Sequence, residues 1–146
     1  MPVIDILEKR IQYRIKKSKD SVFMLPDFLD LSDRDQVMRA LRKLIKSGLI
    51  LKVGQGVYVK AEKSIINGDL IPTINLTEIG KIVAKKLKIK TILNKYELWY
   101  NEGKTTQVPT GYVIPVLGRI NRRIGFNGVY IKYETVRNKD KYYRYN

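Results

Sequence analysis

The sequence contains neither cysteine nor histidine among its 146 residues. Their absence excludes disulfides, zinc fingers, cysteine nucleophiles, histidine general bases and histidine metal sites. Carboxylate, lysine or tyrosine chemistry stays open, but the acidic residues are scattered and no glycine-rich phosphate loop of the P-loop or Rossmann kind is present. We therefore expect no catalytic site, no metal and no cofactor, and a protein that is not an enzyme.

Long hydrophobic runs are also lacking. Residues 113–117 (VIPVL) are typical of the apolar segments, and none approaches the roughly 20 residues that a membrane-spanning helix needs. Residues 1–5 lack the basic stretch followed by an apolar run that marks a signal peptide. We expect a cytoplasmic protein with no membrane partner.

Negative charge is scarce. Lysine and arginine number 29 against 14 acidic residues, a formal net charge of +15. Such a surplus favours a polyanionic partner, because neutralised phosphates release condensed counterions. Nucleic acid is the first candidate and an anionic membrane surface the second, while a solvated basic surface that only aids solubility is the alternative. Residues 1–72 carry a net charge of +5 and residues 73–146 a net charge of +10.

The chain begins with a pattern of short helices. Apolar residues at helical spacing predict a helix over residues 3–17, with a second, basic stripe of Arg10, Arg14 and Lys17. A β-prone run follows at residues 21–25. Pro26 then suits the first turn of a short helix over residues 27–31.

A longer helix is predicted after Ser32. Ser32 and Asp35 have the spacing of a capping box, and Gly48 is placed to stop the helix in a left-handed conformation. One face is apolar, with Val37, Leu41, Leu44 and Ile45. The opposite, exposed face is predicted to hold Gln36, Arg39, Arg42, Lys43 and Lys46.

Two strands, at residues 49–53 and 57–60, flank Gly54-Gln55-Gly56, whose glycines permit a tight hairpin. The succession of helix, strand, short helix, long helix and hairpin predicts a winged helix-turn-helix over residues 1–62. Its long helix would enter the DNA major groove and its hairpin would reach the flanking backbone. A protein-interaction module is the alternative for this half.

The remainder predicts a small α/β module over residues 73–146, and hence an α+β protein. Residues 61–74 are interpreted as a linker, residues 75–78 as a second helix cap, and the segment around Tyr96 and Trp99 as a further short helix. A strand is expected at residues 112–117, at a sheet edge because of Pro115. Alternation over residues 119–124 and 129–134, around Asn127-Gly128, predicts an antiparallel hairpin.

Basic and aromatic residues are mixed in this second half. Such mixtures suit phosphates and stacked bases, although a charged sheet edge and a frayed tail would look the same. An RNA-binding or single-strand-binding protein, with Tyr112, Tyr130 and Tyr133 as stacking platforms, is therefore a rival hypothesis. The residues concerned are Arg119, Arg122, Arg123, Lys139, Lys141 and Arg144, among Tyr142, Tyr143 and Tyr145.

Several motifs together resemble a known family. They are residues 37–44 (VMRALRKL), 48–50 (GLI), 54–58 (GQGVY) and 105–109 (TTQVP). Over residues 3–135 the chain resembles the AbiEi-like type IV antitoxins, winged-helix regulators of bacterial abortive-infection operons. The resemblance implies repression of its own operon through promoter repeats, and a nucleotidyltransferase-like toxin from the adjacent gene as partner. It places Gln36, Arg39, Arg42 and Lys43 on the recognition helix and Gln55 at the wing tip.

The sequence thus predicts a double-stranded DNA-binding transcriptional repressor, with its oligomeric state open. Arg39 and Arg42 would read bases or clamp phosphates, and Gln36 could pair with adenine. Lysines would hold the backbone. The predicted DNA-binding set is Gln36, Arg39, Arg42, Lys43, Lys46, Lys52, Gln55, Arg119, Arg122 and Arg123.

Overall fold

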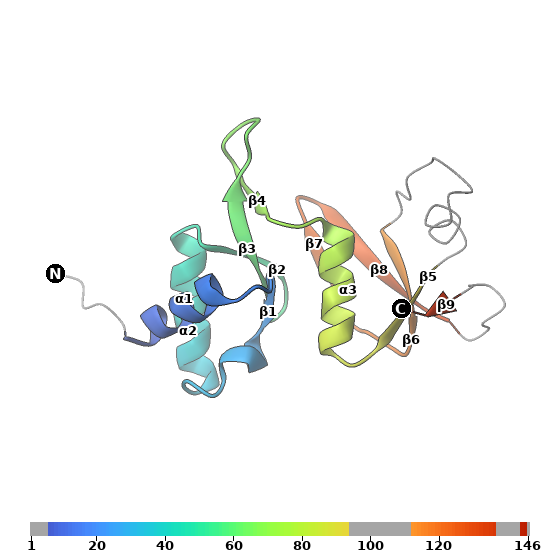
Figure 1. Cartoon of the computed structure of the whole chain (residues 1–146), viewed down its shortest axis with the longest axis horizontal. Coiled ribbons are helices and arrows are strands. Elements are labelled where there is room, and N and C mark those ends of the chain that lie inside the picture. The colour runs from blue at the N-terminus through green and yellow to red at the C-terminus, as the bar shows by residue number, and fades with distance from the viewer. Residues whose placement is uncertain (1–5, 94–111, 137–143, 146) are drawn as a thin grey trace. The chain divides into compact units, whose positions relative to one another are not determined.

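The computed structural model describes residues 6–93, 112–136 and 144–145 (Figure 1). The motif at residues 105–109, the aromatic segment around Tyr96 and Trp99, and the tail residues 137–143 lie outside this part. The chain is an α+β protein that divides into two compact units, Met1–Asn75 and Leu76–Asn146.

The first unit combines two α-helices with a small antiparallel sheet, and both helices lie on the same side of its strands (Figure 1). Its strand order is β1-β3-β2, and β4 pairs with the far part of β3. The elements are α1 (Ile6–Lys17), β1 (Val22–Met24), the 3-10 helix η1 (Leu25–Phe28), α2 (Arg34–Lys46), β2 (Ile50–Gly54), β3 (Val57–Lys63) and β4 (Leu70–Pro72).

The core of this unit lies between the helices and the sheet. Ile11 and Ile15 of α1 meet Phe28 of η1 and the apolar face of α2, and all are almost completely buried. On α2, the predicted inward residues Val37, Leu41 and Leu44 are buried, and Ile45 packs at the margin. Burial of this one face therefore fixes which side of α2 remains in solvent.

Two expectations for the first unit were wrong. The N-cap of α2 is Asp33, not Ser32: Asp33 has extended dihedral angles and its Oδ1 accepts the Gln36 amide at 2.9 Å. A carboxylate at this position also interacts favourably with the helix dipole. The segment 61–74 is not a linker, because β3 continues to Lys63 and β4 pairs back onto it. The turn signal at Gly68, with φ of 78°, reverses the chain within a hairpin.

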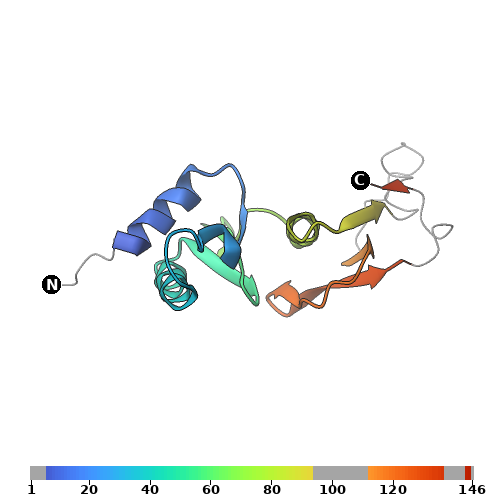
Figure 2. The same ribbon diagram turned by 90° about the horizontal axis from the view of Figure 1, so that it is seen from below.

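Within its described residues, the second unit has one helix, which packs on a five-stranded sheet of order β7-β8-β6-β5-β9 (Figure 2). Strands β6 and β8 are parallel and the other pairs are antiparallel. The elements are α3 (Leu76–Lys86), β5 (Lys90–Leu93), β6 (Val113–Leu117), β7 (Ile124–Phe126), β8 (Val129–Thr135) and β9 (Arg144–Tyr145).

Gly80 marks the closest approach of α3 to this sheet. A Cβ atom at Gly80 would lie 2.5 Å from Cδ1 of Ile114 and 2.6 Å from Cδ1 of Ile131. The hydroxyl of Tyr133 donates a 2.6 Å hydrogen bond to the Gly80 carbonyl oxygen. Helix and sheet are therefore joined by apolar packing and by a partly buried hydrogen bond at the same residue.

The hairpin prediction for this unit is confirmed and the edge prediction is wrong. Asn127 and Gly128, with φ of 56° and 80°, form the two-residue turn between β7 and β8. Strand β6, however, lies between β5 and β8, and Pro115 is buried. Its pairing with β5 covers Val116 and Leu117 only, so Pro115 is not in that ladder. Residues 119–123 do not continue the β7 strand.

Candidate nucleic-acid interface

The exposed face of α2 is the main candidate site. Opposite the buried face, all five residues predicted to face outward are exposed: Gln36, Arg39, Arg42, Lys43 and Lys46. Their spacing along a helix of 3.6 residues per turn places them on one side. The side chains on this face can donate hydrogen bonds to phosphates or to base edges.

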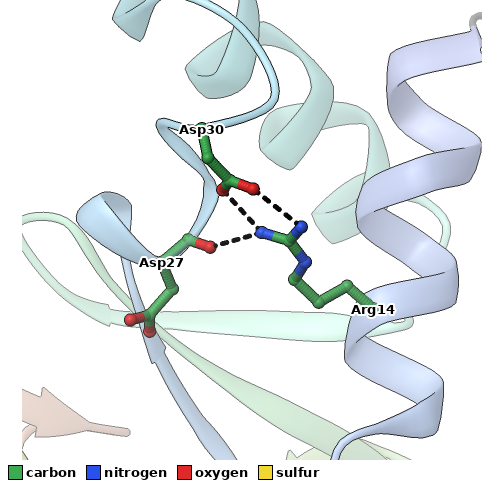
Figure 3. A network of polar contacts seen from close by, with 3 residues as sticks. All are labelled: Arg14, Asp27 and Asp30. Atoms are coloured by element: carbon green, nitrogen blue, oxygen red, sulfur yellow. Dashed lines mark hydrogen bonds and ion pairs between the residues drawn. The ribbon is translucent and has the colours of Figure 1, made fainter.

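A polar clamp fixes the segment that leads into α2 (Figure 3). Arg14 of α1 donates to both carboxylate oxygens of Asp30, at 2.7 and 2.9 Å, and to the Asp27 carbonyl oxygen at 2.8 Å. The Asp27 carboxylate in turn accepts the Met24 amide at 2.8 Å. The predicted basic stripe of α1 is therefore corrected: Arg14 is engaged inside the unit, because two acceptors in the segment after β1 match its planar fork.

The ionisation of the clamp follows from its geometry. The hydrogen bond from Arg14 lowers the pKa of the Asp30 carboxyl, and the same bond raises the pKa of Arg14. The pair is thus charged at neutral pH. Because Asp30 is exposed, we assign this ion pair a positioning role and little free energy.

Tyr58 of β3 belongs to the core that the sheet shares with α2. Burial raises the pKa of Tyr58, and the positive charges of Arg42 and Arg34 partly oppose that shift. Lys52 of β2 is directly opposite Tyr58 in the sheet register. Opposed residues in an antiparallel pair leave the sheet on the same side. Lys52 therefore lies on the side of the sheet where α2 packs, and it is exposed.

The turn between β2 and β3 consists of Gln55 and Gly56, and only Gly56 needs a positive φ, 67°. The carbonyl oxygen of Gly56 accepts the Leu25 amide at 3.2 Å. This hydrogen bond anchors the turn of the hairpin to η1. Gln55 is exposed at its end.

The three predicted arginines of the second unit do not form one patch. The Arg123 guanidinium stacks on the Tyr130 ring at 4.0 Å from its centre. Arg122 is half-buried and lies near Tyr133, whose pKa its charge lowers against the dominant effect of burial, which raises it. Tyr130 and Tyr133 point to opposite faces of β8, so Arg122 and Arg123 serve opposite faces of the sheet. Arg119 is exposed in the segment before β7.

Sequence reasoning missed two residues of the α2 surface. Arg34, the first residue of the helix, is exposed, and so is Asp35 beside Gln36. The predicted cap at Ser32 gave Asp35 a capping role. The predicted exposed face did not include Arg34 or Asp35. The signal that would have found them is Asp33 itself, since aspartate is among the best N-cap residues.

Other kinds of site find no support in the described ranges. Among residues 6–93, 112–136 and 144–145, no cluster of three acidic side chains is arranged to hold a metal ion. Within the same ranges, no helix combines the length and the apolarity that crossing a membrane requires.

Comparison with known proteins places the chain in a family. A model for a family of unknown function, DUF6088, matches residues 9–140. The chain belongs to the DUF6088 family. The DUF6088 match includes α2, the β2–β3 hairpin and the basic hairpin of the second unit. No curated protein and no solved structure matches the chain.

Proposed function

We propose that this DUF6088 protein binds double-stranded DNA in a sequence-specific manner and acts as a transcriptional repressor. The observation that carries the proposal is α2. One face is locked into the core, a carboxylate cap defines its first turn, and the opposite face exposes Gln36, Arg39, Arg42, Lys43 and Lys46.

The topology of the first unit supports a winged helix-turn-helix. The element order α1, β1, η1, α2, β2 and β3 is the expected one, with the 3-10 helix in place of the second helix. The hairpin directly follows α2, and Lys52 lies on the α2 side of the sheet. Helix and hairpin could therefore contact base edges and backbone from one surface.

The side chains on the α2 face suit recognition of base edges as well as contacts to the phosphate backbone. Arginine can donate two parallel bonds to guanine, and glutamine can pair with adenine. Asp35 adds an acceptor near the helix start, which suits the amino group of cytosine and disfavours close phosphates.

The wider role we propose is that of an antitoxin-like regulator in a bacterial defence operon. This part rests on the resemblance of residues 37–58 to AbiEi-like antitoxins. Its test is genetic: the neighbouring gene should encode a nucleotidyltransferase-like toxin, and expression of that gene should be harmful without this protein.

A selection of bound duplexes from a random library, with the purified full chain, tests the main proposal. We expect a short enriched motif, and competition by that duplex but not by its separated strands. If no motif is enriched, the protein binds duplex DNA without sequence specificity. Preference for the single strands would favour the second candidate function.

That second candidate, single-strand binding by the second unit, is favoured by one observation. The Tyr130 ring is 47% exposed, and the Arg123 guanidinium lies over it at 4.0 Å from its centre. An exposed ring with a bound cation is a stacking surface for bases. If single strands bind, Tyr130→Ala should weaken them and leave duplex affinity unchanged.

A further inference from the structure

The turn between β3 and β4 carries a fully exposed apolar tip. Ile65 and Ile66 are 102% and 90% exposed, and the hairpin projects from the body of the first unit (Figure 1). Two adjacent branched aliphatic side chains in solvent are costly unless a partner covers them, because apolar surface in water is unfavourable.

This tip is rigidly built. The Ser64 amide donates to the Asp69 carbonyl oxygen at 2.7 Å, and the Gly68 amide donates to the Ser64 carbonyl oxygen at 2.9 Å. The side-chain oxygens of Ser64 and Asn67 accept the amides of Ile66 and Asp69. The isoleucines are therefore presented in one arrangement, which lowers the entropy lost when they are covered. We call Ile65 and Ile66 the knob.

A complementary surface lies along α1 of the same unit. An open groove of about 990 Å³ has a mainly apolar lining that includes Ile6, Tyr13 and Leu31. Ile6 and Tyr13 are 70% and 65% exposed and lie two helical turns apart. The rest of the rim is rich in cations, namely Lys9, Arg10, Lys16 and Lys17.

Charge indicates what this groove accepts. Its cationic rim disfavours a basic segment and favours an apolar one with acidic neighbours. The knob has that composition, since Glu62 and Asp69 flank it with Lys63 as the one cation among them. We propose that the knob of one molecule docks into the α1 groove of a second copy of this chain.

Two other occupants fit less well. DNA would meet the carboxylates of Glu62 and Asp69 beside the knob, and phosphates are repelled there. Two α1 grooves facing each other would bring their cations together, which costs free energy. A knob-in-groove contact between copies avoids both problems and is independent of the proposed DNA binding.

The contact should be weak and sensitive to salt. Two isoleucines and a rim of charges cover far less than the 1,200 Å² or so of a standard stable interface. We therefore expect a dimer that forms at protein concentrations on the order of 10–100 µM at low salt, and dissociates as salt screens the rim charges.

Sedimentation velocity on the full chain, without DNA, tests the proposal. The knob variant Ile65→Ser/Ile66→Ser and the groove variant Ile6→Ser/Tyr13→Ser should each raise the dimer dissociation constant about tenfold or more, as loss of an interface anchor does. Both should keep the thermal unfolding of the natural chain, because the replaced side chains are exposed. The control Tyr112→Ser/Val129→Ser removes exposed apolar side chains of the second unit and should dimerise normally.

A mixing experiment distinguishes this contact from general stickiness. The knob variant retains its groove and the groove variant retains its knob, so an equimolar mixture regains one intact contact and should associate more tightly than either variant alone. A chain that is monomeric at all concentrations overturns the proposal, as does a mixture no tighter than its components. The groove would then be left to another occupant, such as an acidic segment of another protein.

Discussion

At the scale of single residues, Gly80 shows two effects in competition. Alanine is favoured over glycine in a helix by about 1 kcal/mol. Yet its methyl group would lie within 2.6 Å of the Cδ1 atoms of Ile114 and Ile131, which are buried and have little room to move. Overpacking of this kind typically costs about 1–3 kcal/mol. Packing therefore outweighs propensity.

We expect Gly80→Ala to be less stable than the natural chain by about 1 kcal/mol in urea denaturation followed by circular dichroism. Lys85→Ala, on the exposed side of the same helix, is the control and should not lose stability. An alanine variant as stable as the natural chain would mean that α3 does not pack on the sheet at Gly80.

Tyr133 predicts how stability depends on alkaline pH. Burial raises the pKa of its phenol above the ordinary value of 10.0. The folded state therefore holds this proton more tightly than the unfolded chain does. That stabilisation is complete below pH 10 or so and is lost as the pH rises further.

Tyr133→Phe removes both the proton and the bond to the Gly80 carbonyl oxygen. We expect a loss of about 0.5–1.5 kcal/mol at neutral pH, the usual net worth of such a bond. The difference between the two proteins should shrink as the pH rises above 10. Parallel pH profiles would contradict the assignment.

Removing the charge of Asp35 should raise the affinity for random duplex DNA, whereas removing a basic residue should lower it. Asp35→Asn removes a negative charge from the α2 face and keeps a similar shape. Random duplex DNA should then bind a few-fold more tightly, because one phosphate repulsion disappears, while preference for the selected motif falls. Equal gains on both DNAs would show that Asp35 reads no base.

At the scale of elements, α2 and the hairpin should behave differently. If α2 lies in the major groove, Arg39→Ala should lose about 1–3 kcal/mol on the selected duplex and little on random DNA. Lys52→Ala, on β2, should weaken both and lower the salt slope by about one unit. Fluorescence anisotropy on both duplexes measures this. If each variant loses the same affinity on the selected duplex as on random DNA, α2 contacts the DNA backbone and does not recognise bases.

Elements whose signal is local could be predicted from the sequence. The helices follow from apolar spacing, and the turns at Gly56 and Asn127-Gly128 follow from residues that tolerate positive φ. On α2 the five side chains that this spacing predicted to face outward are exposed, but Arg34 and Asp35 were missed. The cap was misplaced by one residue, because Ser32 and Asp33 are both good caps.

Features that depend on distant pairing could not be predicted. β6 pairs in parallel with β8, which lies beyond β7 in the chain, and no local pattern specifies that order. Pro115 indicated an edge because proline lacks an amide donor, yet a strand can be central where pairing stops short of the proline. Residues 61–74 were interpreted as a linker because Asn67-Gly68 and Pro72 are turn signals, and the same signals occur in the β3–β4 hairpin that the structure has there.

At the scale of the whole molecule, some of the cations behind the net charge of +15 have structural roles, among them Lys60, whose Nζ donates to the Ser18 carbonyl oxygen at 2.6 Å. The Arg14–Asp30 clamp is a structural use of a cation, whereas most cations of α2 and α3 lie outside the cores. A net positive charge of this size favours a polyanionic partner.

The salt dependence of DNA affinity tests how much of this positive charge contacts phosphates. If about 6 phosphates are neutralised, affinity should fall by roughly three orders of magnitude between about 50 and 200 mM salt. Variants in one unit at a time can then show how many of the phosphate contacts each unit makes. Arg39→Ala/Lys46→Ala in the first unit should reduce the slope of log affinity against log salt by about two units if both side chains contact phosphates.

The matched pair in the second unit is Arg119→Ala/Arg123→Ala, two exposed arginines in the half with the larger net charge. If both units hold one duplex, this variant should lower the slope by a similar amount and reduce affinity for all sequences equally, since backbone contacts carry no base preference. An unchanged slope would confine DNA binding to the first unit. A flat response of the natural chain to salt would remove phosphate binding as its main activity, because each neutralised phosphate releases counterions and binding must therefore weaken as salt rises.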